Sequence, residues 1–379
     1  ATHEEYAEIA SAEGRRRQVV EPGTLYSVSR VRREFSDQSS LGFIFTTTNR
    51  SLAESVSFLP ERALTGGIDY DWRIGQRWGL KGYWAGSNVS GSAGAIEELQ
   101  RSTVHSYQRP DAGHVELDPL AETLRGHSGM MSFGKIAGER TRMDVNVGYK
   151  SPGFDVNDLG FQARADEIPQ NSWVQVRWQT PGKYTRNINL NFNQWSAFNF
   201  DGDRLELGGN VNAHWDFQNF WETGFGVNIN ARTFDDRLTG GGPGGYDEPG
   251  RSSWQYFNSD NRRVVSFKWN SAFGGGGGGR FFELQPATMI RPISSFSTEI
   301  GFNYYNNIDD AQWVAEVLQP ERTHYVFGRL EQETHSLTLR VDYTMTPTLS
   351  LQLYGQPFVS SGDYVSYKEL VDGRAERYE

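Results

Sequence analysis

The sequence predicts an all-β protein whose strands form one large antiparallel sheet. Three observations lead to this fold class. Apolar and polar residues alternate over long segments, glycine and aromatic residues are unusually frequent, and clusters of turn-forming residues separate the alternating segments. Of the 379 residues, 42 are glycine, 13% are aromatic and 37% are hydrophobic. Glycine makes up ~7% of an average protein, so this composition indicates a chain with many turns.

Strict alternation over two residues is the strongest local signal. In residues 336–345, apolar side chains occupy every second position and hydroxyl or charged side chains lie between them. Successive side chains of a strand point to opposite faces of its sheet, so this pattern predicts a strand with one apolar and one polar face. The turn at Thr346 and Pro347 joins it to residues 349–354 as a hairpin. The other alternating segments are, in chain order, residues 143–149, 174–178, 187–193, 204–217, 221–232, 265–269 and 296–304.

The length and polarity of these strands predict a more specific architecture. Residues 204–217 alternate over about a dozen positions, whereas strands of soluble proteins usually have ~5–6 residues and membrane-crossing strands ~9–11. A polar face rich in Asn, Asp, Glu and Arg suits a hydrated interior and not the core of a sandwich. We therefore expect an antiparallel transmembrane β-barrel of the outer-membrane type, with roughly 16–20 strands in this chain. A large soluble β-barrel or propeller with one wet face is the alternative.

Aromatic residues near the strand ends resemble the girdles found at membrane interfaces. These residues are Tyr149, Trp178, Trp195, Trp215, Trp221 and Trp269.

The connections are expected to alternate between short turns and long loops. Short turns are predicted at residues 180–182, 201–203 and 346–347, and long loops at residues 88–126, 151–171 and 234–254. The glycine-rich runs at residues 240–245 and 274–279 are expected to be flexible loops. Both contain G-x-G-x-x-G, but neither lies between a strand and a helix, so neither predicts nucleotide binding.

Helix is expected in two places, at residues 3–17 and at residues 95–100. The basic run Arg15, Arg16 and Arg17 is expected to be a solvated turn. The chain is accordingly divided into an N-terminal segment, residues 1–23, which is partly helical or loop, and a barrel domain, residues 24–379.

Composition excludes several classes of protein. A net charge of -10 without a basic patch argues against nucleic acid as a partner. The chain has no cysteine, so it has neither disulfides nor thiolate metal sites, which fits an oxidising envelope compartment. The chain has no apolar run of ~20 residues, so no membrane-spanning helix is predicted. Residues 1–10 do not resemble a secretory signal peptide.

The sequence offers few candidates for chemistry. H-E-x-x-H, G-x-S-x-G and phosphate-binding motifs are absent, so no catalytic residue is predicted. His214 shares the polar face of its strand with Glu206 and Asp216, either as a titratable cluster or as part of a hydrated wall. The polar positions expected to face the interior, and so to bind a ligand, are Glu206, Asn210, Asn212, His214, Asp216, Glu222, Asn228, Asn230 and Arg232.

Acidic pairs in the loops are weak candidates for a metal site. Carboxylates could offer oxygen ligands to Ca²⁺, the one cofactor that the sequence allows. The candidates are Asp235, Asp236, Asp247 and Glu248, and the pair Asp309 and Asp310 is a further one.

Several segments together resemble a known family. The most specific reads Y-K-S-P-G-F-D-V-N-D-L-G-F at residues 149–161, and others lie at residues 26–42, 91–96, 107–112, 325–327, 336–340 and 351–358. These segments are similar to bacterial outer-membrane proteins of unknown function, domain of unknown function 5916, in which a barrel follows an N-terminal carbohydrate-binding-like domain of family 9. The resemblance covers residues 21–370 and implies an outer-membrane β-barrel in a Gram-negative-type envelope. It also implies that the barrel domain is incomplete at both ends. The family fixes no catalytic residues.

The function expected from these features is a channel, or a protein that takes up or binds a solute or glycan. A structural barrel that anchors a cell-surface assembly through its loops is one alternative, and a hydrolase in the barrel mouth is a second. The expected partners are outer-membrane lipid, a glycan or small solute, and a protein at the loops.

Overall fold

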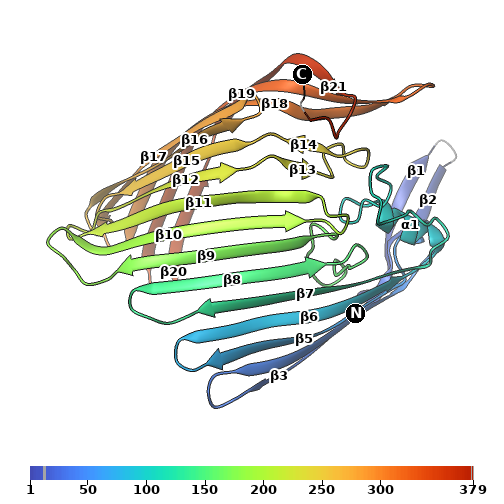
Figure 1. Ribbon diagram of the computed structural model, residues 1–379, viewed down its shortest axis with the longest axis horizontal. Helices are drawn as coiled ribbons and strands as arrows, with labels where there is room; N and C mark the ends of the chain where they lie inside the picture. Colours follow the sequence, from blue (N-terminus) through green and yellow to red (C-terminus); the bar gives the residue numbers. More distant parts are fainter. Residues whose placement is uncertain (12–13, 377, 379) are drawn as a thin grey trace.

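The computed structural model describes residues 1–11, 14–376 and 378, and its fold is all-β with antiparallel pairing throughout. The main sheet has seventeen strands among these residues (Figure 1). In chain order they are β3 (Gly23–Glu34), β4 (Ser40–Ser51), β5 (Arg62–Ile74), β6 (Trp78–Ser90), β7 (Thr123–Lys135), β8 (Thr141–Lys150), β9 (Ile168–Trp178), β10 (Thr185–Phe198), β11 (Arg204–Phe217), β12 (Glu222–Asn230), β15 (Gly250–Asn258), β16 (Val265–Gly276), β17 (Gly279–Ile293), β18 (Phe296–Leu318), β19 (Thr323–Thr346), β20 (Leu349–Gly355) and β21 (Phe358–Leu370).

The remaining elements are short. Two separate hairpins, β1 (Glu5–Ser11) with β2 (Gly14–Glu21) and β13 (Thr233–Asp235) with β14 (Gly245–Asp247), lie outside the main sheet. The helices are the 3-10 turn η1 (Glu54–Val56) and α1 (Ala93–Arg101). The side chain of Ser92 caps α1 by accepting a hydrogen bond from the backbone N–H of Ala95 at 3.2 Å. The helical turn expected at residues 95–100 is therefore confirmed.

The last two strands share one position at the edge of the sheet. β20 pairs with residues 339–346 of β19, and β21 pairs with residues 325–336 of the same strand. The interruption between them falls at Gln356 and Pro357, where proline has no N–H to donate to a ladder. The seventeen strands therefore occupy sixteen positions.

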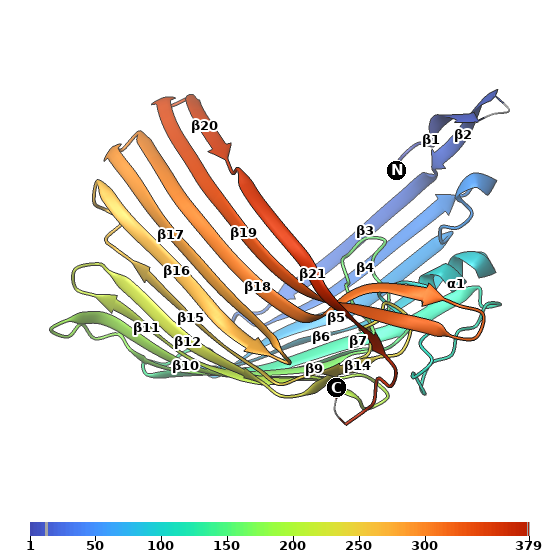
Figure 2. The same cartoon turned by 90° about the horizontal axis from the view of Figure 1, so that it is seen from above.

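The sheet is strongly curved. Its strand order places β21, at one edge of the sheet, next to β3, at the other edge. Within the described residues, however, no residue-by-residue register joins these two strands, and Figure 2 shows β3 and β20 diverging as the two walls of a trough. Sixteen positions in an up-and-down meander leave the two edge strands antiparallel to each other, so direct pairing between them is geometrically allowed.

The two faces of the sheet differ in the way that alternation predicts. Apolar side chains on the outer face are exposed on every part of the sheet, for example Phe43, Ile68, Phe192, Val211, Phe225, Phe267, Ile300, Leu337 and Leu351. The inner face carries the polar positions. The buried apolar cluster is small: Ala63, Val89 and Leu124 on the inner face pack with Ile96 of α1. The molecule thus keeps most of its apolar side chains on an outer surface rather than in a core.

The expected helix at residues 3–17 is wrong, because this segment forms the β1–β2 hairpin; residues 12–13 lie outside the described residues. Tyr6 stands opposite Val19 and Glu8 opposite Arg17, and the Arg17 guanidinium lies 4.2 Å from the centre of the Tyr6 ring. An isolated helix of this length is only marginally stable, so cross-strand contacts decide the outcome. The run Arg15–Arg17 is exposed as expected, but it belongs to β2 and not to a turn.

The run of six glycines at residues 274–279 is not the flexible loop that we expected. Gly274–Gly276 end β16 and Gly279 begins β17, so the turn itself is Gly277 and Gly278. Both have positive φ, 57° and 85°. A two-residue hairpin turn of this kind needs positive φ at both positions, which glycine adopts without strain.

Candidate functional site

Three of the sequence-predicted residues lie side by side on the inner face of the sheet. Asn210 and Asn212 come from β11 and Asn228 from β12, and the register places Asn228 directly opposite Asn210. On the other side, β10 places Asn193 opposite Asn210 and Asn191 opposite Asn212. The even spacing of these residues therefore becomes a patch of amides across three neighbouring strands.

Hydrogen bonds join these amides into a chain. Asn193 Nδ2 donates to Asn210 Oδ1 at 3.1 Å, Asn210 Nδ2 donates to Asn228 Oδ1 at 2.7 Å, and Asn228 Nδ2 donates to the Ser252 hydroxyl at 2.9 Å. Asn212 also donates to Asn210 Oδ1. Asn210 is one of the buried polar residues, and its bonds hold the amide planes of its neighbours in fixed orientations.

A parallel chain continues from Asn191 through Asn212 to His214. Asn191 donates to Asn212 Oδ1 at 2.8 Å, and this oxygen also lies 3.0 Å from His214 Nε2. The second ring nitrogen of His214 lies 3.0 Å from the Tyr256 hydroxyl. Both nitrogens of His214 therefore have partners, which favours a wall residue over a free titratable group. The structure does not bring Glu206 to His214 as the sequence cluster suggested; Glu206 instead lines a separate cavity.

Aromatic rings lie among these amides, each across a glycine of the next strand. Trp195 of β10 stands opposite Gly208, and Trp254 of β15 stands opposite Gly226. A Cβ atom on Gly208 would lie 2.6 Å from the Trp195 ring, and one on Gly226 would lie 2.4 Å from the Trp254 ring. The rings therefore occupy the space that a side chain would need, and they lie flat over the strand.

Tyr256 repeats this arrangement over Gly224, where a Cβ atom would lie 2.3 Å from its ring. The rings of Trp254 and Tyr256 are nearly parallel, with an interplanar angle of 9° and 6.3 Å between their centres. The sequence interpretation of Trp195 as a girdle residue is wrong, because Trp195 has the same parity in β10 as Asn193 and lies on the inner face.

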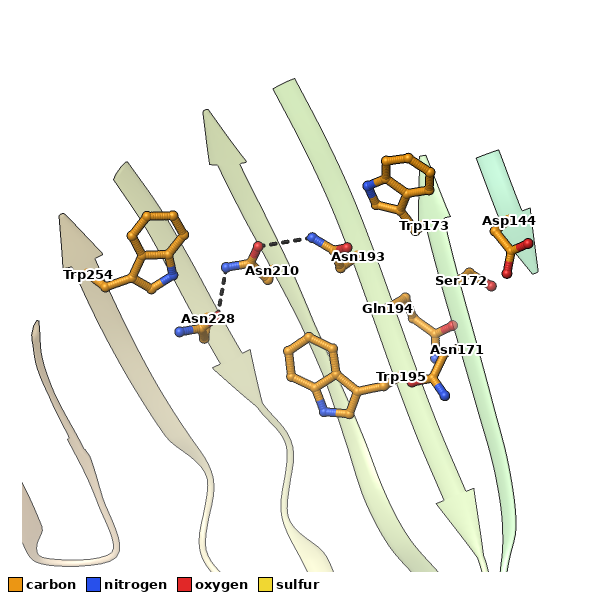
Figure 3. A pocket seen from close by; sticks show the side chains of 10 residues that line it. All are labelled: Asp144, Asn171, Ser172, Trp173, Asn193, Gln194, Trp195, Asn210, Asn228 and Trp254. Atoms are coloured by element: carbon orange, nitrogen blue, oxygen red, sulfur yellow. Dashed lines mark hydrogen bonds between the residues drawn. The ribbon is translucent and has the colours of Figure 1, made fainter. Parts of the chain in front are cut away.

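The amides and indoles together line an open cavity of about 420 Å³. Figure 3 shows the indoles of Trp173, Trp195 and Trp254 nearly face-on, around the row formed by Asn193, Asn210 and Asn228. The volume lies within the ~300–1,000 Å³ typical of small-molecule sites. Its lining residues are Asp144, Asn171, Ser172, Trp173, Asn193, Gln194, Trp195, Asn210, Asn228 and Trp254. We call these residues the amide–indole site.

The other predicted residues lie toward the two ends of the strands. Asp216 and Glu222 stand opposite each other at one end, where Asn187 donates to Asp216 at 2.7 Å. Toward the other end, Glu206 and Asn230 line a second cavity of about 490 Å³ together with Asp235, Asp247 and Glu248. Arg232 does not face the amide row; its Nε donates to Glu248 at 3.1 Å and its guanidinium lies 3.9 Å from the centre of the Tyr246 ring.

Three long connections fold together at one end of the sheet. They are residues 91–122 between β6 and β7, residues 151–167 between β8 and β9, and residues 231–249 between β12 and β15. A Cβ atom on Gly242 would lie 2.3 Å from the Tyr325 ring at the start of β19, although β15–β18 stand between β12 and β19 in the sheet. The third connection therefore crosses the space inside the trough. We call these three connections the cap.

A buried charge network joins the three connections of the cap. Arg109 is 6% exposed, and its guanidinium lies 2.7 Å from Asp236 and 3.2 Å from Asp166. Arg164 also donates to Asp236 at 2.7 Å, and Arg237 donates to the backbone carbonyl of Val104 at 2.7 Å. These contacts join all three pairs of connections, so the network fixes their relative positions. Sequence reasoning missed this network, because Arg109 and Asp236 are far apart in the chain and belong to no motif.

The acidic candidates for a metal site are not arranged to hold an ion. Asp236 is committed to arginines: burial opposes its ionisation, but Arg164, Arg109 and Arg237 hold its pKa below the usual range. Asp235 has a raised pKa, caused chiefly by burial. Burial and the nearby carboxylates Asp235 and Asp309 raise the pKa of Asp247 to about 6. Within the described ranges, no group of three or more His, Asp or Glu side chains is arranged to hold a metal ion.

A second buried contact joins two connections of the cap. His105 and Asp155 are almost fully buried, with 3.0 Å between His105 Nε2 and Asp155 Oδ2 and 2.7 Å between His105 Nδ1 and the carbonyl oxygen of Pro152. Because a carbonyl can only accept, Nδ1 is the donor to Pro152. Asp155 lies in the segment at residues 149–161 that carries the most specific sequence signature, and its backbone N–H donates to the Ser87 hydroxyl of β6 at 3.0 Å. This signature therefore marks the attachment of a loop to the sheet.

The fold and the site define an all-β protein in which the inner face of one antiparallel sheet carries an open cavity lined by asparagine and tryptophan. The chain belongs to the family described as domain of unknown function DUF5916, which matches residues 80–379. No curated protein matches the chain. Among the helices in the described part of the chain, none has the length and apolar character needed to cross a membrane.

Proposed function

We propose that the protein is an outer-membrane β-barrel protein that takes up or binds a polar solute, such as a glycan, on its inner face. The observation that carries this proposal is the inverted distribution of side chains. Phe192 on the outer face of β10 is 44% exposed, whereas Asn191, its neighbour on the inner face, is 8% exposed. The same inversion recurs in β11, where Val211 is 48% exposed and Asn210 is 9% exposed.

An outer surface of this kind requires an apolar environment. Contiguous apolar patches of more than a few hundred Å² are rare on soluble monomers and mark sites for a membrane or for another protein. Exposed apolar residues here extend around the whole sheet rather than forming one patch. Lipid covers such a band more readily than a single protein partner does.

The backbone supports the same proposal with one condition. Every strand between β4 and β19 has partners on both sides, so its N–H and C=O groups are paired within the sheet wherever the registers of the two neighbours overlap. In a bilayer the edge strands β3 and β20–β21 must also be paired, because lipid offers no hydrogen bonds. Their antiparallel orientation permits this closure.

The cap determines whether the proposed pathway is open. Its third connection crosses the inside of the trough, and its charged network is buried, so the cap obstructs one end of the inner face. We therefore expect low conductance from the unmodified protein and higher conductance when the cap is loosened.

Conductance in planar lipid bilayers tests the proposal. Replacing Arg109 with Met breaks the buried network, whereas Arg263, whose side chain is 78% exposed, offers a matched Arg→Met control. Insertion, with conductance that rises in Arg109→Met and not in Arg263→Met, would support solute passage. Failure of the full chain to insert into any bilayer would overturn the membrane assignment.

A structural, anchoring barrel is the second candidate, and the rigidity of the cap favours it. Loops that are locked by buried ion pairs can present a fixed surface to a partner. Purification from native membranes under mild conditions distinguishes the two candidates. A stoichiometric partner that crosslinks to the cap would favour anchoring, and isolation of the protein alone would count against it.

A further inference from the structure

We propose that the amide–indole site binds the pyranose ring of a neutral sugar, with one face of the sugar stacked on Trp254 or Trp195 and its hydroxyl groups bound by Asn228 and Asn193. This inference rests on the proposed function and specifies the ligand class of the same inner face. Three features of the site support it: the orientation of the aromatic rings, the unpaired hydrogen-bond donors and acceptors of the amides, and the small number of charged side chains.

The indoles are positioned as stacking surfaces. Trp254 and Trp195 lie flat over Gly226 and Gly208, and their outer faces point into the cavity (Figure 3). The face of an aromatic ring carries negative quadrupole charge and attracts weakly positive hydrogens. The C–H groups on one face of a pyranose ring are hydrogens of this kind. Rings that stood upright between their neighbours would offer only an edge.

The glycines allow the indole rings to take this flat orientation and keep them in it. Any side chain at Gly226 or Gly208 would collide with the indole, at 2.4 Å and 2.6 Å respectively. Aromatic residues placed across glycines also strengthen a sheet, so one such pair has a structural explanation. Two such pairs, Trp254 over Gly226 and Trp195 over Gly208, contribute their indoles to the lining of the same cavity.

One amide holds its neighbours in position, and two others keep groups free to bind a ligand. Asn210 accepts from Asn193 and Asn212 and donates to Asn228 Oδ1 and to the Val227 carbonyl, which uses its full capacity. Asn228 donates once, to Ser252, and accepts once, so one N–H and one lone pair remain for a ligand. Asn193 likewise keeps its carbonyl oxygen available among the described contacts. Asn210 is thus a positioning residue.

Spare donors and acceptors on neighbouring amides match hydroxyl groups. A hydroxyl donates one hydrogen bond and accepts others, and an amide offers both functions a short distance apart. A carboxylate or phosphate ligand would instead need a cationic partner, and none of the residues that line the site is Lys, Arg or His. The one acidic residue of the lining is Asp144, and its Oδ2 already accepts from Ser132 at 2.7 Å. The lining therefore favours a neutral ligand over an anionic one.

Binding of defined hexasaccharides to the full chain in detergent micelles tests this inference. The probes are maltohexaose and cellohexaose as neutral ligands and hexagalacturonate as a charged one, and the readout is intrinsic tryptophan fluorescence with calorimetry as a second measurement. We expect saturable binding of at least one neutral probe, and binding at least about tenfold weaker for the charged probe. Equal binding of all three, or preference for the charged probe, would overturn the inference.

Three variants locate the binding. Trp254→Ala and Asn228→Leu should each weaken binding of the neutral probe about tenfold or more. Trp178→Ala is the matched control, because Trp178 lies on β9 with its side chain 40% exposed on the outer face. Heat-modifiable migration on gels confirms that each variant retains its sheet. If Trp178→Ala weakens binding as much as Trp254→Ala does, the site assignment is wrong.

This test separates the two proposals. A protein that inserts into bilayers and conducts, yet binds neither neutral probe, contradicts the sugar assignment and leaves the proposed membrane function intact. A protein that binds a neutral probe at the amide–indole site but never inserts supports the sugar assignment and contradicts the membrane function.

Discussion

The guanidinium of Arg109 lies 2.7 Å from the carboxylate of Asp236, and both side chains are buried. One residue belongs to the connection after β6 and the other to the connection after β12. This contact joins loops from distant parts of the sheet into a single cap over its inner face. Asp236 also accepts from Arg164 at 2.7 Å, and Arg109 also lies 3.2 Å from Asp166, so the stability of the cap depends on a shared network of buried charges.

Replacing Arg109 with Met should destabilise the cap and leave the sheet folded. Removing one partner of a buried ion pair costs about 3–5 kcal/mol when the other charge is left without compensation. Asp236 keeps its contact with Arg164, so we expect a loss of no more than about 3 kcal/mol. Hydrogen exchange of the cap connections measures this loss locally. Arg263→Met, at an exposed ion pair, should cost no more than about 1 kcal/mol. Unchanged exchange in the cap of Arg109→Met would show that the pair does not hold it.

Asp247 should make the cap sensitive to pH in one direction. Its pKa is raised to about 6, so the folded cap favours the protonated acid more than the unfolded chain does. The buried carboxylate therefore lowers the free energy of unfolding of the cap at high pH. This destabilisation is absent below the ordinary pKa of ~4, grows between pH 4 and 6, and is complete above pH 6. Asp247→Asn should therefore raise the thermal stability of the cap at pH 7.5.

The pH profile provides the control for Asp247→Asn. The gain over the unmodified protein should shrink from pH 6 to pH 4 and vanish below that range. Glu248→Gln is the matched variant, because it removes the negative charge that faces Arg232 at 3.1 Å and should not stabilise the cap at pH 7.5. A stability gain at Asp247→Asn that is independent of pH would contradict the assigned cause.

Gly226→Ala should disturb the amide–indole site. The new Cβ would lie 2.4 Å from the Trp254 ring and would force the indole off the strand, at a cost of about 1–3 kcal/mol in stability. Binding of the neutral sugar probe should weaken together with this loss of stability. Gly66→Ala is the matched control, because its Cβ would meet Phe45 at an ordinary 3.6 Å. Equal effects of the two variants on binding would refute the stacking role of Trp254.

An arginine on the outer face should be costly only in the middle of the sheet. Val211 lies at the centre of β11, and Val211→Arg in a bilayer should destabilise the protein by about 2–4 kcal/mol. Val317, near the end of β18, gives a Val→Arg control that should cost about 1 kcal/mol or less. Unfolding in lipid vesicles with urea measures both. In water a substitution at such an exposed site would stay within about 0.5 kcal/mol.

The sequence alone predicted the strands well, because alternation over two residues directly records the two faces of a sheet. It failed at residues 3–17, where helix-favouring alanine and glutamate lose to cross-strand contacts such as Arg17 with Tyr6. The cap network could not be found, since no local pattern connects Arg109 to Asp236. The amide row was predicted, but the indoles were not. The shared parity of Trp195 and Asn193 was the available signal, and the flat attitude of the ring depends on Gly208 in the next strand.

The central claim is that lipid covers the outer face and water reaches the inner face, and adjacent positions of β11 test it most directly. Because the chain has no cysteine, Val211→Cys and Asn212→Cys each give a single spin-label site in the full chain in lipid vesicles. We expect the label at residue 211 to collide mainly with dissolved oxygen, as a label in lipid does. We expect the label at residue 212 to collide mainly with a water-soluble nickel chelate. Equal access of the nickel chelate to both positions would contradict it.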